Sequence, residues 1–168
     1  MLRRRGLLVF AFIWALLAFL VLPGSCAKSA AKTPYVIGAI FSTTGDNAPL
    51  GVPERDTAEM LVKQINARGG VNGHPLKLLV YDDAGKSDQA AQAAQRLIAD
   101  KRVVAIIGPT LTGPSLAIAT NCQNAKMPLL SCAAAVTIVQ PVKSYVFKTA
   151  QSDSLAVAKL IDYCQQRK

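Results

Sequence analysis

Tyr35-Val-Ile-Gly-Ala-Ile-Phe41 and Leu76-Lys-Leu-Leu-Val-Tyr81 are the two stretches that decide the fold. The first is a short, continuous apolar run rich in β-branched and aromatic residues, which is typical of a strand buried on both faces, and the second is predicted to be the next strand. Between them, apolar residues recur at helical spacing from Glu54 to Asn66, and Gly69-Gly70 ends the pattern. A strand, a helix and a second strand in this order predict parallel pairing through a right-handed crossover.

The same alternation continues along the chain. It predicts helices at 88–100 and about 114–123, strands at 103–107, 127–130 and 145–148, and a last helix at 152–168. No strand follows that last helix, so the pattern of the lobe is unfinished. The fold class predicted from this order is α/β, with a doubly wound parallel sheet covered on both faces.

The N-terminus has the three parts of a secretory signal. Arg3–Arg5 form a basic region, Leu7–Leu22 an apolar region, and small residues follow at a cleavage site. The alternative is an uncleaved membrane anchor, which needs about 20 apolar residues, and Pro23 and Gly24 break this run first. We therefore predict export, with a signal peptide at 1–26 and a spacer at 27–34.

Two kinds of processing remain open at this cleavage site. Leu22-Pro23-Gly24-Ser25-Cys26 resembles a bacterial lipoprotein box, although Pro23 stands where that pattern prefers an aliphatic residue. Lipid on Cys26 would anchor the mature protein to the membrane, since several acyl chains hold a protein stably where one does not. Cleavage after Ala27 or Ala31 would instead release it into the periplasm.

Charge and cysteine spacing exclude several classes of function. Three of the nine excess positive charges belong to Arg3–Arg5, and the rest are scattered singly without interleaved aromatic residues, unlike a nucleic-acid-binding surface. The spacings typical of zinc or thiol redox sites are absent, so we predict no metal and no cofactor. An oxidising compartment would permit a disulfide between Cys122 and Cys132.

Ligands of open parallel sheets gather where the strands end, because helix N-termini point unpaired N–H groups outward there. The loops to examine are therefore 42–50, 82–87, 108–113 and 131–137. Their side chains are mostly hydroxyls and small groups, which favour binding over catalysis.

Enzyme readings of these loops are weak. The lone histidine, His74, lies in a predicted turn before a strand, so a surface role is expected for it. Asp82-Asp83 could form a carboxylate pair, but such pairs more often are solvated or cap helices. A small exported hydrolase that uses Ser115 or Ser131 is a weak alternative, because the closing glycine of a nucleophile elbow is absent.

Several motifs together resemble the Leu/Ile/Val-binding family of periplasmic binding proteins, which have a two-lobed type I fold. They are Val36-Ile-Gly-Ala-Ile-Phe-Ser-Thr-Thr-Gly45, Ile65-Asn-Ala-Arg-Gly-Gly-Val-Asn-Gly73, Tyr81-Asp-Asp83, Ile106-Ile-Gly-Pro109 and Phe147-Lys-Thr-Ala-Gln-Ser-Asp153. The resemblance covers Tyr35 to Lys168. It implies an N-terminal lobe at 35–150 and, at 151–168, the start of a crossover to a second lobe.

The resemblance also implies a ligand site. Thr112 and Gly113 fall where the family binds the ligand's carboxylate, and a helix N-terminus explains why that position suits an anion. Ala133 and Ala135 fall where a small residue and a Ser/Thr meet the carboxylate and ammonium, and Ser42 completes the predicted set. Ala135 departs from the family's hydroxyl, so an amide, organic acid or aromatic acid joins the amino acids as a candidate ligand unless Thr137 substitutes.

The function that the resemblance implies is that of a non-enzymatic, extracytoplasmic solute receptor. Its partners would be a small ligand and the permease and ATPase subunits of an ABC transporter, with membrane contact only through a signal peptide or a lipid. The family chain is about twice as long, so this sequence is expected to be a truncated reading frame or a fragment. The alternative function is a ligand-sensing domain of a regulator or receptor.

Overall fold

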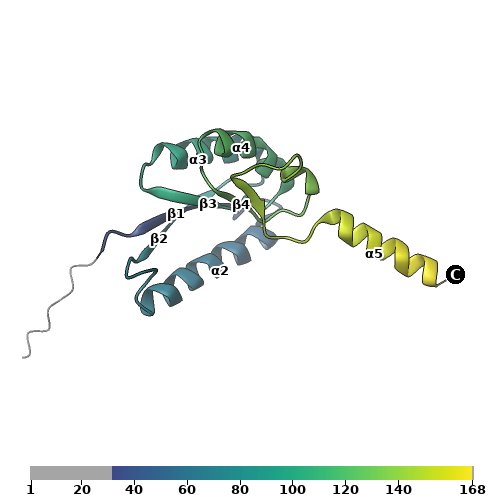
Figure 1. Cartoon of the computed structure of the whole chain (residues 1–168), viewed down its shortest axis with the longest axis horizontal. Helices are drawn as coiled ribbons and strands as arrows, with labels where there is room; N and C mark the ends of the chain where they lie inside the picture. The colour runs from purple at the N-terminus through teal and green to yellow at the C-terminus, as the bar shows by residue number, and fades with distance from the viewer. Residues whose placement is uncertain (1–31, 168) are drawn as a thin grey trace, which may run out of the picture. The chain divides into compact units, whose positions relative to one another are not determined.

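The computed structural model describes residues 32–167, which form one compact unit. Five strands make one parallel sheet in the order β2-β1-β3-β4-β5 (Figure 1). The strands are β1 (Tyr35–Phe41), β2 (Leu76–Asp82), β3 (Val103–Ile107), β4 (Leu129–Ser131) and β5 (Val146–Lys148). The predicted doubly wound α/β class is confirmed, and each predicted strand lies within two residues of its expected position.

Helices lie on both sides of this sheet. They are α2 (Ala48–Ala67), α3 (Ser87–Ala99) and α4 (Thr112–Asn124). A short 3₁₀ turn at Val136–Ile138 precedes β5, and helix α5 (Asp153–Gln166) follows it. Figure 1 shows α3 and α4 side by side on one face and α2 on the other. The predicted connections through helical crossovers are therefore present.

The start of α2 differs from the sequence prediction. We expected the helix to begin at Glu54, but it begins at Ala48, because Pro49 lies in its first turn and Pro53 is accommodated near its beginning. Proline in a first turn gives up no helical hydrogen bond, so it marks a start instead of a break. The end agrees with the prediction, since Gly69 and Gly70 both have positive φ just after Ala67.

Small residues let α3 pack closely on the sheet. Ala90, Ala93 and Ala94 are all buried on one face of this helix. Leu97, on the same face, lies against β1 so tightly that a Cβ on Gly38 would come within 2.6 Å of its Cδ1. The glycine in the first predicted strand is therefore required by packing, and this side of the sheet holds the densest part of the core.

Helix α5 contributes nothing to that core. None of its residues is buried, although it carries five large apolar side chains with at least half of their surface exposed. Within residues 32–167 no helix is both long and apolar enough to cross a membrane. Cys26 and the predicted signal peptide lie outside the described residues.

The three cysteines within residues 32–167 are unpaired. Cys122 is buried, Cys132 is half-buried, Cys164 is exposed, and all three are free thiols. The disulfide that the sequence would permit between Cys122 and Cys132 is therefore not formed.

Candidate ligand-binding edge

The parallel strands bring four loops to one edge of the sheet. The loops after β1 and β3 are joined directly, since the backbone N–H of Ser42 donates to Thr110 Oγ1 at 3.0 Å. The N-termini of α3 and α4 also lie together here, because a Cβ on Gly113 would lie 3.4 Å from Ser87 Oγ. The four loops chosen from the sequence therefore form one continuous surface, as predicted.

A buried hydrogen-bond network supports this edge from below. Ser42 Oγ donates to Asp83 Oδ1 at 2.7 Å, and the N–H of Gly85 donates to the same oxygen at 2.9 Å. Ser42 and Asp83 have no exposed surface, and Asp83 Oδ2 has no hydrogen-bond partner among the described residues. The Ser42 hydroxyl is already hydrogen-bonded to Asp83. The predicted ligand residue Ser42 is therefore buried behind the surface of this edge, where it holds the loop after β1 in place.

Glu54 extends the network to α2. The Thr110 hydroxyl donates to Glu54 Oε2 at 2.6 Å, so one side chain joins α2 to the loop after β3 and to Ser42. Burial raises the pKa of the Glu54 carboxyl, the hydrogen bond from Thr110 opposes that rise, and the nearby Asp83 charge adds to it. This contact could not be predicted from the sequence, because Glu54 lies in a pattern typical of the exposed side of an amphipathic helix.

Asp82 fixes the loop after β1 by a different set of bonds. It accepts hydrogen bonds from the backbone N–H groups of Thr43 and Thr44, from the Thr44 hydroxyl at 2.6 Å and from the N–H of Ala84. Burial alone would raise the pKa of Asp82, but these hydrogen bonds outweigh it and lower the pKa. Asp82 and Asp83 thus organise two loops instead of forming a paired acid–base site.

Thr112 and Gly113 open helix α4. Leu111 has an extended backbone before the helix, and no side chain caps this end. Thr112 is half-buried and Gly113 exposed, so the first two residues of α4 reach the surface, whereas Pro114 and Ser115 are buried. An uncapped helix N-terminus with a neighbouring hydroxyl is suited to binding a carboxylate.

The loop after β4 presents the two predicted alanines. Ala133 is 5% exposed and Ala135 is half-buried, so the second reaches the surface more than the first. Ser131 Oγ accepts a hydrogen bond from the Ala133 N–H at 3.1 Å and lies 2.7 Å from Ser115 Oγ. Both serines are fully buried, so they hold this loop against α4.

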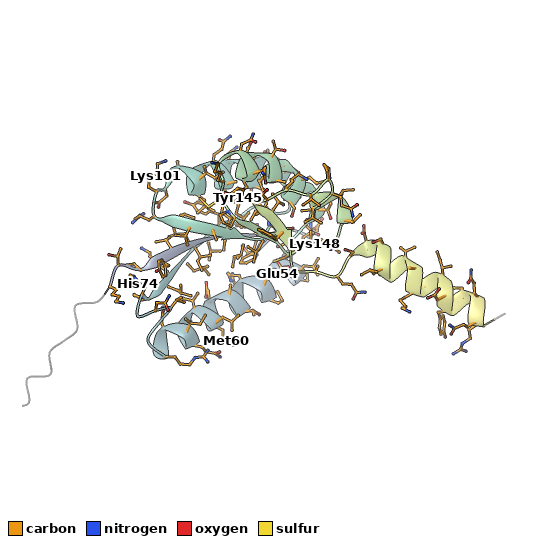
Figure 2. The ribbon with its side chains drawn as sticks, in the orientation of Figure 1. Glu54, Met60, His74, Lys101, Tyr145 and Lys148 are labelled. Carbon is orange, nitrogen blue, oxygen red and sulfur yellow. The ribbon has the colours of Figure 1, made fainter. Side chains whose placement is uncertain are left out.

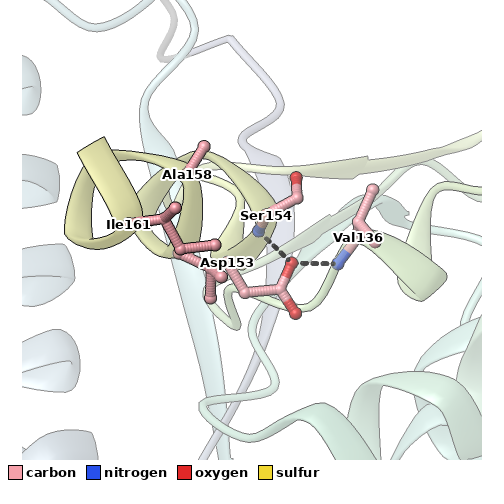
Figure 3. A pocket seen from close by; sticks show the side chains of 6 residues that line it. Val136, Asp153, Ser154, Ala158 and Ile161 are labelled. Carbon is pink, nitrogen blue, oxygen red and sulfur yellow. Dashed lines mark hydrogen bonds between the residues drawn. The ribbon is translucent and has the colours of Figure 1, made fainter. Parts of the chain in front are cut away.

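The start of α5 holds the same loop from the other side, through residues for which the sequence predicted no role. Asp153 Oδ1 accepts hydrogen bonds from the N–H groups of Val136 and Ser154, as Figure 3 shows. Lys148 donates to the carbonyl oxygens of Ala134 and Ala150. The motif ending in Asp153 supported the family resemblance, and the structure gives it this physical function.

The only histidine is remote from these serines. His74 stacks on Tyr35 at a centroid distance of 4.7 Å, and its Nδ1 lies 2.7 Å from the Thr33 carbonyl oxygen. Figure 2 shows His74 at the amino ends of the strands, away from Glu54 and Lys148. No histidine can therefore serve Ser115 or Ser131 in this arrangement, and the described residues contain no cluster of metal-binding side chains.

Comparisons with known proteins agree with this architecture. The family model described as "Periplasmic binding protein" matches residues 34–168. A Leu/Ile/Val-binding protein homolog from Brucella melitensis is 28% identical over 136 residues, which are 80% of this chain and 37% of that protein. An amino acid binding protein from Pseudomonas aeruginosa is 37% identical over 78 residues, or 46% of this chain and 21% of that one.

Solved structures show the same relationship. The substrate-binding protein LivJ of a branched-chain amino acid transporter from Streptococcus pneumoniae, in complex with isoleucine, matches with a TM-score of 0.68 and 30% identity. The match covers 73% of this chain and 35% of LivJ. A type 1 periplasmic binding protein from Bordetella pertussis matches with a TM-score of 0.67 and 29% identity, over 71% and 34% of the two chains.

These matches confirm the resemblance and the type I fold class that it implied. The chain spans between 21% and 37% of the length of the curated relatives named above. Its five-stranded parallel sheet corresponds to one lobe of their fold. The chain belongs to the periplasmic binding protein family.

Proposed function

We propose that the edge formed by Thr112, Gly113, Ala133 and Ala135 binds the carboxylate end of an amino acid or a related small carboxylate or amide. The observation that carries this proposal is the uncapped N-terminus of α4, which offers backbone N–H groups and a hydroxyl at a solvent-facing position. The network behind it holds the loops in place and, apart from the backbone N–H of Ala133, uses no group of these four residues. The arrangement supplies binding groups and no nucleophile with a base, in keeping with a receptor.

The loop after β4 limits which ligands fit. Ala135 can offer only its backbone to a ligand ammonium, so an amino acid loses one hydrogen bond at this position. A ligand without a charged amine loses nothing there. The proposal therefore includes 2-oxo acids, and amides that lack a charged amine, beside leucine, isoleucine and valine.

We further propose that the chain is exported and serves as the receptor lobe of an ABC transporter, with permease and ATPase subunits as partners of the longer protein. Such receptors close two lobes around a ligand, and each lobe supplies one side of the binding cleft. The four predicted ligand residues would then contribute half of the contacts. The truncation inferred from the sequence is part of this proposal, and sequencing of the DNA beyond the codon for Lys168 tests it, because no second lobe in any frame would contradict it.

The ligand edge can be tested on the chain itself by NMR. The amide resonances of Thr112, Gly113, Ala133 and Ala135 should shift on addition of leucine or 4-methyl-2-oxopentanoate at millimolar concentration, and should shift less with leucinamide, which has no carboxylate. Thr112→Val should reduce these shifts, while the control Thr120→Val, an exposed change on the same helix, should leave them unchanged. Shifts confined to another surface for all three compounds would contradict the proposal.

A further inference from the structure

Ala134, which lies between the two predicted ligand alanines, is held by two residues from outside the ligand loop. Its carbonyl oxygen accepts hydrogen bonds from Lys148 Nζ at 3.0 Å and from the N–H of Asp153 at 3.3 Å. The N–H of Val136 donates to Asp153 Oδ1 at 3.1 Å (Figure 3). Two peptide groups of the loop after β4 are therefore attached to Lys148 and Asp153, which together we call the clamp.

The clamp determines where the N–H of Ala135 points. The Ala134–Ala135 peptide is trans and planar, so its carbonyl and its N–H point in opposite directions. Since the carbonyl points to the clamp, the Ala135 N–H points away from it. No hydrogen bond within the described residues uses this N–H, and Ala135 is half-buried. The clamp therefore holds one free donor in a fixed direction.

The side of the loop opposite the clamp faces the start of α4. The N–H of Cys132 donates to the carbonyl oxygen of Pro109 at 3.1 Å, and the two buried serines described above join the loop to α4. The loop after β4 thus lies between the clamp and the loop after β3. A donor that points away from the clamp is directed to the side where Thr112 and Gly113 begin α4.

Lys148 also affects how strongly this donor binds. Its half-buried ammonium donates to the carbonyl oxygens of Ala134 and Ala150 and forms no ion pair within residues 32–167. A hydrogen bond from a charged donor is stronger than a neutral one, and hydrogen-bonded groups polarise one another. A positive charge beside the Ala134 oxygen draws electron density across the peptide. The N–H of the same peptide therefore becomes a better donor to an anion.

We propose that Lys148 and Asp153 are positioning residues for ligand binding, which hold the Ala135 N–H toward the ligand's carboxylate beside Thr112 and Gly113. The inference rests on the proposed function, because that function supplies the anion. Both residues act through the backbone of the loop and need no contact with the ligand. The clamp also gives a physical reason why alanine can serve at position 135, since the group that it orients belongs to the main chain.

NMR spectra of the ligand-free chain test the clamp by itself. Lys148→Met keeps the length of the side chain and removes its charge and its donors. The Ala135 amide resonance should shift and its heteronuclear NOE should fall, because the Ala134 carbonyl loses one of two donors. Lys148→Arg should restore both values. Lys143→Met is the matched control, since Lys143 also donates to two carbonyl oxygens, further along the same loop, and should leave Ala135 unchanged.

Titration with leucine and with 4-methyl-2-oxopentanoate tests the consequence for binding. Lys148→Met should raise the Kd about three- to tenfold, which corresponds to the loss of one hydrogen bond. Lys148→Arg and Lys143→Met should stay within about twofold of the unmodified chain. Asp153→Ala should weaken binding in the same direction as Lys148→Met, because it releases the next peptide of the loop. The shifts at Thr112 and Gly113 should persist in every variant.

Two results would overturn the positioning role. One is an Ala135 amide whose resonance and mobility are unchanged in both Lys148→Met and Asp153→Ala, and the other is an equal Kd for Lys148→Met and Lys143→Met. Asp153→Ala keeps the test available if Lys148→Met does not fold, since α5 adds nothing to the core. An absence of shifts at Thr112 and Gly113 with both compounds would contradict the proposed function instead, and the ligand-free spectra would still decide whether the clamp exists.

Discussion

Removing the Thr110 hydroxyl should destabilise the lobe although the overall shape of the side chain is kept. Thr110→Val leaves the buried N–H of Ser42 without its acceptor and Glu54 Oε2 without its donor. A buried group left unpaired costs about 1–3 kcal/mol. Glu54 is only partly buried and can regain water, so it adds less. The expected loss in the free energy of unfolding is about 2–3 kcal/mol in total.

Urea denaturation followed by circular dichroism measures this loss. Thr120→Val is the matched control, because it makes the same chemical change at an exposed position of α4 and should stay within about 0.5 kcal/mol of the unmodified chain. Adding Glu54→Gln completes a double-mutant cycle, in which a coupling of about 1 kcal/mol between residues 54 and 110 is expected. A change below about 0.5 kcal/mol for Thr110→Val, or strictly additive effects, would refute the bridging role of Thr110.

Four further predictions concern pH, thiols, export and affinity. Burial raises the pKa of Glu54 above 4.5, so the free energy of unfolding should fall as the pH rises from 4.5 through the higher pKa of the folded state. Glu54→Gln should therefore gain stability relative to the unmodified chain over that pH interval. Urea midpoints at several pH values would show this gain. Burial raises the pKa of Cys122 and of Cys132 to about 11, so a chromogenic disulfide reagent at neutral pH should modify Cys164 first, and equal rates for all three thiols would contradict the burial. If Cys26 carries lipid, Cys26→Ser should move the protein from the membrane fraction to the periplasm; cleavage after residue 27 or 31 predicts no such shift, and mass spectrometry that found Met1 intact would contradict both. The isolated chain should bind leucine with a Kd weaker than about 1 mM in calorimetry, since an open half-site leaves the ligand hydrated, whereas micromolar binding would show that one lobe suffices.

The fold could be predicted from the sequence because its signals are local. Each strand is built mainly from apolar residues, and the end of α2 is marked by Gly69-Gly70. The start of α2 was wrong because Pro49 and Pro53 suggest a loop when the chain is read without its surroundings. Proline marks a first turn only once the position of that turn is known.

The loops that form the candidate site could be predicted from the sequence, but the roles of the residues in those loops could be predicted only in part. The rule that ligands gather at strand ends selected four loops that lie at one edge of the sheet, but it could not show that Ser42 turns inward to Asp83. Glu54 and Asp153 were missed because their partners lie 56 and 17 residues away in the sequence. Contacts of that kind depend on which loops the sheet order brings together, and no local pattern encodes them.

The position of β1 in the sheet determines how the lobe can assemble. β1 is the first strand in the sequence yet lies inside the sheet, with β2 on one side and β3, β4 and β5 added in sequence order on the other. A chain that emerges from a membrane channel with its N-terminus first can therefore form β1, α2 and β2 as a nucleus. The sheet then grows at one edge only: β3 pairs with β1, β4 with β3, and β5 with β4. Growth in this direction never requires a strand to be inserted between two that are already paired, so partly emerged chains can keep the structure they have formed while the rest follows.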